Sequence, residues 1–331
     1  MRVPAALARA RAALPAPVEK VLRALDGAGH RSWIVGGAVR DLLLGRRREG
    51  TDFDVATPAT PEQVSALFRK VIPTGVDHGT VTVVLGGEAI EVTTFRGEGA
   101  YVDGRRPESV TFHTDLEADL ARRDFTMNAL AWDPLAPEFR DPFGGRADMA
   151  RRLVRAVGDP AARFGEDGLR AMRAVRFAAQ LGYGLHPGTR RAIPGALDVV
   201  RKVSVERVSE ELSRLVVAPH APRALGLMRR TGLLGVVLPA LAASPPADLD
   251  HAVAVLRRVP PEPALRLAAL LHGLGPAEAE RILVALRQPR RVSDEVAALV
   301  RAHACLAAGA GPLPASPVEV RRWLARVGLA R

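Results

Sequence analysis

The sequence predicts an α+β fold, with a mixed sheet and its helices in the first half of the chain and helices alone in the second half. Two observations predict it. From about residue 31 to 156, short runs of β-type residues alternate with helical stretches. After about residue 160, apolar residues recur at spacings of three and four, the period of an amphipathic helix. A chain of 331 residues is long enough for two or three domains.

The strands of the first half are predicted from short, patterned runs. Apolar and polar residues alternate in TVTVV and IEVTTF, which is typical of half-buried strands. The predicted strands are SWIV (32–35), DFDVAT (52–57), GTVTVVLGG (79–87), EAIEVTTF (88–95), SVTFHT (109–114) and MNALAWD (127–133). Helices are predicted between them at PEQVSALFRKV (61–71) and DLEADLARR (115–123).

The second half reads as amphipathic helices separated by Pro and Gly clusters. These helices are predicted over residues 164–182, 204–217, 221–234, 250–259, 263–275 and 294–308. We therefore expect a first domain over residues 1–157, a helical neck over 158–240 and a helical body over 241–331. The last stretch, residues 318–331, is amphipathic and has no stop signal. We expect the body to be truncated there, short of a full tail.

Composition narrows the class of protein. Hydrophobic residues make up 48% of the chain and charged residues 25%, which is typical of a globular protein. No run of about 18 apolar residues exists, so we expect no membrane span. Residues 1–13 lack the apolar segment of a secretory signal, and we expect a cytoplasmic protein. The single cysteine, Cys305, excludes an intramolecular disulfide and a cysteine-based zinc site.

The net charge of +11 favours a polyanionic partner such as nucleic acid. Lysine occurs only at Lys20, Lys70 and Lys202, and arginine supplies the remaining basic charge. Such an arginine bias is also typical of a GC-rich genome. The charge alone therefore leaves both interpretations open.

Asp52 and Asp54 lie two residues apart in a β-type run, so both face the same side of the predicted strand. Adjacent carboxylates repel unless a cation neutralises them, and Mg²⁺ prefers such oxygen ligands together with substrate phosphates. Metal sites of this kind catalyse phosphoryl and nucleotidyl transfer. An isolated Asp-x-Asp pair is more often a solvated turn, so the metal-site hypothesis depends on the surrounding sequence.

Gly36 and Gly37 follow an apolar strand and precede a short helix that is predicted to start near Val39. Glycines there let backbone N–H groups approach a phosphate, and Arg40 adds positive charge. An ordinary strand-to-helix turn is the alternative. No Gly-Lys-Ser/Thr follows, which excludes a P-loop, and the pattern is not a dinucleotide-binding fingerprint either.

In combination, these motifs resemble the tRNA nucleotidyltransferase and poly(A) polymerase family, the class II branch of the polymerase-β-like nucleotidyltransferases. The resemblance begins with Gly-Gly-x-Val-Arg-Asp at 36–41, followed by a Leu-rich helix and Asp-x-Asp. Four further segments follow in the family's order, namely EVTTFR (91–96), RRDFTMNALAWD (122–133), EDGLRAMRAVRF (166–177) and ERVSEELSRLV (206–216). The resemblance spans roughly residues 32 to 240. It implies a polymerase-β-like head and a neck that selects the nucleotide.

The resemblance implies that a 3′-hydroxyl attacks the α-phosphate of CTP or ATP and that pyrophosphate is released. It implies Mg²⁺ as the cofactor, held by Asp52 and Asp54. Glu91 is a candidate third catalytic carboxylate, with an ion pair to an arginine as the alternative. The implied partners are tRNA, CTP and ATP. The sequence predicts no oligomeric state.

The resemblance also implies which residues contact the nucleotide. Gly36, Gly37 and Arg40 are expected at the triphosphate, whereas Asp41 is expected to pair with a nearby arginine.

Within RRDFTMNA, Arg123, Asp124 and Asn128 resemble the family's nucleotide and ribose contacts. A carboxylate or amide can bond a 2′-hydroxyl and so favour ribonucleotides. For Asp124, capping of the following turn is the alternative.

Asp167 and Arg170 are spaced to share one face of a predicted helix. An intrahelical salt bridge is one interpretation. The resemblance implies another, in which the pair acts as an amino-acid template for the base. The carboxylate accepts from the amino group of C or A, which U and G lack at that place. Arg173 and Arg176 continue the stripe toward a phosphate, with a solvated helix face as the alternative.

Two further segments separate the possible activities. Residues 96–110 are rich in Gly and charge and predict a mobile loop, which in the family is linked to the switch to the final A. LLHGLG (270–275) lacks the aspartate of a phosphohydrolase His-Asp motif, so we expect no hydrolase activity and His272 at a helix end.

Full CCA addition to tRNA is therefore the leading hypothesis. An enzyme that adds only A or only CC is the first alternative. A poly(A) polymerase is less favoured, because its Arg-rich signature is missing at residues 73–85. A non-catalytic RNA-binding protein is least favoured, because the Asp52 and Asp54 pair is intact.

Overall fold

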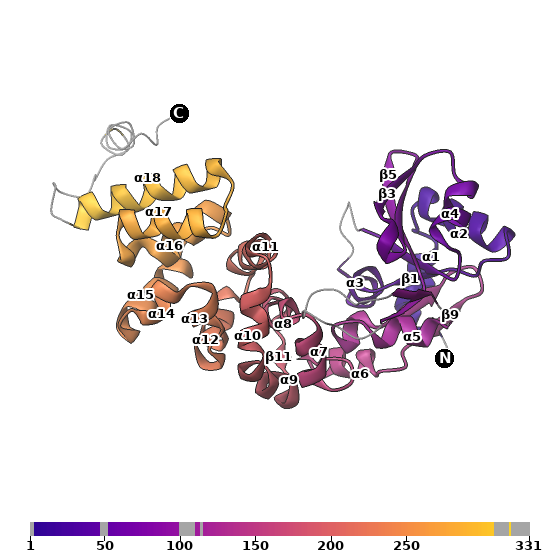
Figure 1. The fold of residues 1–331 in the computed structure, drawn as a ribbon, viewed down its shortest axis with the longest axis horizontal. Helices are drawn as coiled ribbons and strands as arrows, with labels where there is room; N and C mark the ends of the chain where they lie inside the picture. The colour runs from indigo at the N-terminus through magenta and orange to yellow at the C-terminus, as the bar shows by residue number, and fades with distance from the viewer. Residues whose placement is uncertain (1–2, 47–51, 99–109, 113–114, 308–317, 319–331) are drawn as a thin grey trace. The chain divides into compact units, whose positions relative to one another are not determined.

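The computed structural model describes residues 3–46, 52–98, 110–112, 115–307 and 318 (Figure 1). Contacts divide the chain into two compact units, Met1–Glu166 and Asp167–Arg331. Figure 1 shows the strand-rich first unit in indigo to magenta and the helical second unit in pink to yellow. A mixed sheet followed by a helical region confirms the predicted fold class. The domain boundaries predicted after residues 157 and 240 stay a proposal.

A seven-stranded mixed sheet forms the centre of the first unit, in the order β3-β4-β5-β2-β1-β8-β9. Its strands are β1 (Trp33–Val35), β2 (Asp54–Thr57), β3 (Val71–Gly75), β4 (Thr80–Leu85), β5 (Glu88–Thr94), β8 (Ala131–Asp133) and β9 (Glu138–Arg140). The β2–β5 pair is parallel, and the other pairs of this sheet are antiparallel. Two more strands, β6 (Arg96–Glu98) and β7 (Val110–Phe112), pair separately.

Helices and short turns surround this sheet. They are α1 (Ala5–Arg11), α2 (Ala16–Gly27), α3 (Gly37–Leu43), α4 (Pro61–Leu67), η1 (Val76–His78), α5 (Leu116–Ala121), η2 (Thr126–Asn128), α6 (Gly145–Ala150) and α7 (Pro160–Glu166), with the short strand β10 (Leu153–Val154). The core on one side joins Trp33, Val35 and Ala56 of the sheet to Leu120 of α5. This packing holds β1 and β2, the strands next to Gly36 and Asp54, in place.

The second unit is helical apart from β11 (Gly184–Leu185). Its elements are α8 (Leu169–Leu181), α9 (Pro187–Ala192), η3 (Pro194–Ala196), α10 (Leu197–Lys202), α11 (Val205–Val216), α12 (Ala221–Thr231), α13 (Leu233–Val237), α14 (Pro239–Ala243), α15 (Pro246–Leu256), α16 (Pro263–Leu271), η4 (His272–Leu274), α17 (Pro276–Ala285) and α18 (Arg290–Ala307). His272 is the C-cap of α16, which confirms its predicted place at a helix end. No helix in the described ranges is long and apolar enough to cross a membrane.

Several predicted elements were wrong, and two of them bear on the site; elsewhere, the helix predicted over 221–234 is broken at Gly232, and the one predicted over 61–71 ends at Leu67. The run MNALAWD is not one strand, because Thr126–Asn128 form a 3₁₀ turn and β8 begins only at Ala131. Residues 164–182 are not one helix either, because the chain breaks between α7 and α8. A Cβ on Gly168 would lie 2.5 Å from the backbone nitrogen of Val200, so the chain at the break lies against the backbone of α10. Asp167 consequently lies before α8 and not on its face.

Candidate active site

Asp54 and Glu91 stand opposite each other in the sheet. β2 and β5 run parallel, and Asp54 is the register partner of Glu91. Asp54 is half-buried, whereas Glu91 and Asp52 are exposed. Burial raises the pKa of Asp54 to about 6, the charge of Arg123 opposes this rise, and the charges of Glu91 and Asp52 add to it. The three carboxylates predicted from the sequence are therefore electrostatically coupled.

The donor set fits a hard divalent cation. All three side chains offer carboxylate oxygens, and burial, with smaller contributions from the charges of Glu91 and Asp52, raises the pKa of Asp54, so a bound cation would favour its ionised form. In the described part of the chain, no three His, Cys, Asp or Glu side chains form a group that could hold a metal ion. Two carboxylates completed by substrate phosphate oxygens are the arrangement that Mg²⁺ commonly adopts.

Gly36 lies close to both Asp54 of β2 and the side chain of Arg123. It follows β1 with a φ of 72°, a left-handed conformation that favours glycine. A Cβ there would lie 2.8 Å from Nη1 of Arg123 and 3.8 Å from Oδ2 of Asp54. A side chain at position 36 would therefore force the guanidinium of Arg123 to shift from its place beside this turn.

Asp119, which was not predicted from the sequence, forms an ion pair with Arg123. Its carboxylate is fully buried and accepts from Nη2 of Arg123 at 3.3 Å and from Nη2 of Arg122 at 2.6 Å. Burial alone would raise the pKa of Asp119, but the charges and hydrogen bonds of Arg123 and Arg122 bring it below its ordinary value. Asp119 is on α5, and Arg123 follows it four residues later, just after the helix ends. This spacing of four could have predicted the pair from the sequence.

Asn128 links two of the predicted nucleotide-binding residues. Nη1 of Arg40 donates to Oδ1 of Asn128 at 2.7 Å, and Nδ2 of Asn128 donates to Oδ1 of Asp124 at 2.9 Å. The same Asp124 oxygen accepts from the backbone N–H of Phe125 at 2.8 Å. Arg40 also donates to both carboxylate oxygens of Asp41, at 2.8 and 3.0 Å, which confirms the predicted pairing of Asp41 with an arginine.

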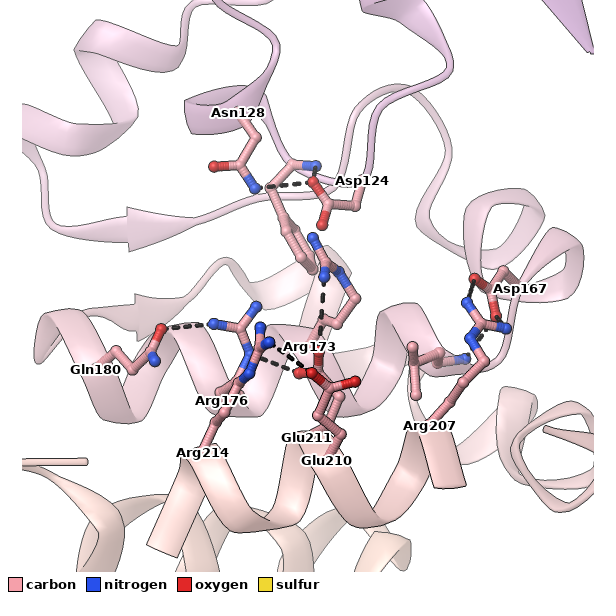
Figure 2. A network of polar contacts seen from close by, with 12 residues as sticks. Asp124, Asn128, Asp167, Arg173, Arg176, Gln180, Arg207, Glu210, Glu211 and Arg214 are labelled. Atoms are coloured by element: carbon pink, nitrogen blue, oxygen red, sulfur yellow. Dashed lines mark hydrogen bonds and ion pairs between the residues drawn. The ribbon is translucent and has the colours of Figure 1, made fainter. Parts of the chain in front are cut away.

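The second unit carries the other predicted group, around α8. Asp167 accepts from the backbone N–H of Leu169 at 3.0 Å. It also accepts from Nη2 of Arg207 on α11 at 2.8 Å (Figure 2). Oδ1 of Asp167 also lies 3.4 Å from Nη1 of Arg207. Arg170 is buried on the first turn of α8. Asp167 is thus paired with an arginine that lies 40 residues later in the chain.

The arginines farther along α8 meet a buried glutamate on α11. Nε of Arg176 donates to Oε2 of Glu211 at 2.5 Å, and Nη1 of Arg173 lies 3.5 Å from Oε1 of Glu211 (Figure 2). Nη1 of Arg176 also donates to Gln180 at 2.5 Å. Arg207 and Glu211 lie four residues apart within ERVSEELSRLV, so that spacing could have indicated a shared face.

Two protein-family models match the chain. Residues 32–155 match a model described as the poly A polymerase head domain. Residues 182–244 match a model described as a probable RNA and SrmB-binding site of polymerase A.

Individual relatives agree with these matches. The chain is 47% identical over 286 residues to the CCA-adding enzyme of Geobacillus stearothermophilus, covering 86% of this chain and 69% of that protein. It is 46% identical over 311 residues to the CCA-adding enzyme of Geobacillus thermodenitrificans, covering 94% and 74%.

Solved structures extend the similarity to the fold. The CCA-adding enzyme of Bacillus stearothermophilus in complex with CTP superimposes with a TM-score of 0.78 at 40% identity, covering 95% of this chain and 75% of that one. A tRNA nucleotidyltransferase complexed with a primer tRNA and an incoming ATP analogue gives a TM-score of 0.69 at 25% identity, covering 93% and 91%.

Proposed function

Because the chain belongs to the family of CCA-adding enzymes, which are tRNA nucleotidyltransferases, we propose that it adds C, C and A to the 3′ end of tRNA. CTP and ATP are the substrates, pyrophosphate is the product, and no nucleic-acid template is used. The observation that carries the proposal is the convergence of Asp54, Glu91, Gly36 and Arg123 at the ends of neighbouring strands. The family membership also confirms the resemblance on which the sequence-based hypothesis rested.

The chemistry assigned to the first unit is one displacement at phosphorus. The tRNA 3′-oxygen forms a bond to the α-phosphorus, and the bond between that phosphorus and the α–β bridging oxygen breaks. Asp52 and Asp54 would hold a divalent metal, proposed to be Mg²⁺, which lowers the pKa of the hydroxyl and stabilises the charge that develops. Glu91, exposed beside Asp54, is available to accept the released proton.

Nucleotide binding is proposed for the residues around Gly36. Gly36, Gly37 and Arg40 bind the triphosphate, and the guanidinium of Arg123 lies beside this turn, where its charge acts on Asp54. Asp124 and Asn128 bond the ribose. Their mutual hydrogen bond holds the amide in one orientation, which favours a role in recognition of the 2′-hydroxyl.

Base selection is proposed for α8. Asp167 accepts from the amino group of C or A, and Arg170 donates to the ring nitrogen and oxygen acceptors of the base. Arg207 supports this role because its charged hydrogen bond orients the Asp167 carboxylate. Arg173 and Arg176 complete the proposed nucleotide-binding set, with Arg176 held by Glu211 in a buried ion pair. The cytoplasmic location expected from the sequence stays a prediction.

Single-nucleotide analysis of tRNA extension tests the proposal. Purified protein is incubated with MgCl₂, CTP and ATP, separately and together, and with transcripts that end before the first C, after C and after CC. Extension of the shortest transcript to CCA is expected. Arrest at CC, or extension of the CC transcript alone by one A, would assign a partial activity instead. Asp52→Ala is expected to abolish incorporation while CTP binding persists, and Asp26→Ala, an exposed aspartate on α2, is the matched control.

A further inference from the structure

Helix α6 packs directly on the turn that carries Asn128. A Cβ on Gly145, the first residue of α6, would lie only 2.2 Å from the backbone oxygen of Thr126 and 2.7 Å from its carbonyl carbon. Real Cβ atoms do not come this close to backbone, so the glycine is what allows the contact. The turn η2 and the helix α6 therefore share a backbone-to-backbone contact next to the proposed ribose site.

Asp148 on α6 adds a buried, charged contact to the same turn. Its side chain is almost fully buried, and Oδ2 accepts from the hydroxyl of Thr126 at 2.8 Å. Nε of Arg155 donates to both oxygens of Asp148, at 3.1 and 3.0 Å. The backbone oxygen of Arg155 accepts in turn from the N–H of Thr126 at 2.9 Å. Thr126 is thus bonded to both members of one ion pair, through its hydroxyl to the Asp148 carboxylate and through its N–H to the Arg155 backbone.

The turn depends on such outside contacts for its shape. η2 contains three residues and has no side-chain hydrogen bond at its N-cap. A 3₁₀ turn of this length has poor internal hydrogen-bond geometry, so neighbouring groups decide its conformation. Asn128 is its last residue and connects Arg40 to Asp124. A shift at Thr126 would therefore move the amide that both of these residues bond.

We propose that Asp148 is a positioning residue for sugar discrimination. By fixing Thr126, it sets the orientation of Asn128 and Asp124, and so determines how strongly the enzyme prefers ribonucleotides over deoxyribonucleotides. Sites built around a substrate hydroxyl reject the analogue that lacks it only when their polar groups are held in place. This proposal rests on the proposed function of Asn128 and Asp124 as ribose contacts.

The test compares CTP with dCTP as substrate for a tRNA transcript that ends before the first C. Thr126→Val removes the hydroxyl at nearly constant volume, and Asp148→Asn removes the charge. Both variants are expected to lower the ratio of kcat/KM for CTP over dCTP by about three- to tenfold, the factor that corresponds to one hydrogen bond. The thermal unfolding midpoint of each variant shows whether it is folded at the assay temperature.

Asp141→Asn is the matched control. Asp141 accepts from the backbone N–H groups of Gly145 and Arg146, at 2.6 and 3.0 Å, so it supports the start of α6 without bonding Thr126. This variant is expected to lower stability and to leave the CTP-to-dCTP ratio unchanged. A fall in the ratio as large as that of Asp148→Asn would reduce Asp148 to a general support of α6 and overturn the proposal.

Asn128→Ala separates the proposal from its premise. If this variant lowers the ratio and Thr126→Val and Asp148→Asn do not, the positioning role is overturned while ribose recognition stands. If Asn128→Ala leaves the ratio unchanged, the ribose assignment is wrong and the proposal is overturned with it. If Asp148→Asn does not fold, Thr126→Val alone decides, because it removes a single hydroxyl from the same contact.

Discussion

Asp54 and Glu91 are register partners in the one parallel pairing of the described seven-stranded sheet. This pairing places a half-buried carboxylate beside an exposed one, and Asp52 adds a third negative charge two residues away. Arg123 offsets part of this charge, yet the pKa of Asp54 is still raised to about 6 by burial and its acidic neighbours. The protein alone therefore leaves a negative charge that a cation would stabilise.

The Mg²⁺ concentration that gives half-maximal activity is expected to rise at acid pH. Below the Asp54 pKa of about 6 a proton competes with the cation for the carboxylate, so more Mg²⁺ is needed for half-maximal CTP incorporation. Titrations with MgCl₂ at about pH 5 and about pH 7.5 measure the difference. In Glu91→Gln the loss of a neighbouring charge lowers the pKa of Asp54, which moves the change to lower pH. Equal Mg²⁺ requirements at the two pH values would contradict the assignment.

Asp54→Asn is expected to stabilise the metal-free protein near neutral pH. The folded-state pKa lies above the ordinary value of 3.8, so folding favours the protonated form. The contribution of Asp54 to stability is therefore present at low pH and is lost as the pH rises through about 6. With EDTA present, the amide should raise the unfolding free energy by about 1–3 kcal/mol near pH 7.5 and by less near pH 5. Denaturant unfolding measures this, and a destabilised variant at the higher pH would refute it.

Gly36→Ala is expected to abolish incorporation because the added methyl group meets Arg123 beside Asp54. Gly29→Ala is the matched control, since Gly29 also has a positive φ, of 82°, and has nothing within 4 Å of its Cβ position. Both variants should lose about 1 kcal/mol of stability from the left-handed backbone. Only Gly36→Ala should lose activity. Comparable activity in the two variants would show that the contact with Arg123 has no role in catalysis.

Local patterns were sufficient for some of the strands and for part of the site, but they did not predict β3 or β9. Alternation predicted β4 and β5, and the sequence pattern alone placed the strand that contains Asp54. The pairing of Asp41 with an arginine also followed from sequence, because the partner is the adjacent Arg40.

The missed features depend on residues far apart in the chain. The run from Met127 to Asp133 looks like one strand, but Thr126 is bonded to Asp148, 22 residues later, and a turn forms instead. Likewise, the helix expected across Asp167 is interrupted where Gly168 meets the backbone of α10. No helical or strand period reports such contacts, because they are formed only when distant segments pack.

Arg207→Ala is expected to relax selection between C or A and U or G. Without this guanidinium, the Asp167 carboxylate loses the charged donor that orients it, while its bond to the N–H of Leu169 remains. We expect incorporation of UTP relative to CTP to rise by about tenfold, equivalent to one charge-assisted hydrogen bond. Arg214→Ala on the same helix is the control, because its pair with Glu210 is exposed and contributes little. An unchanged UTP-to-CTP ratio in Arg207→Ala would remove α11 from base selection.

Glu211→Gln is expected to destabilise the second unit strongly. Glu211 and Arg176 are both almost fully buried, so removal of the carboxylate leaves a guanidinium without its charged partner in a site with little water. Breaking a buried pair in this way costs about 3–5 kcal/mol, more than the pair contributes relative to apolar residues. Denaturant unfolding should show this loss for Glu211→Gln.

Glu210→Gln, one residue earlier on α11, supplies the comparison. Glu210 pairs with Arg214 at the surface, where solvent screens the interaction, and its loss should change stability by less than about 1 kcal/mol. If the two variants unfolded alike, the Arg176–Glu211 pair would be no stronger than an exposed one.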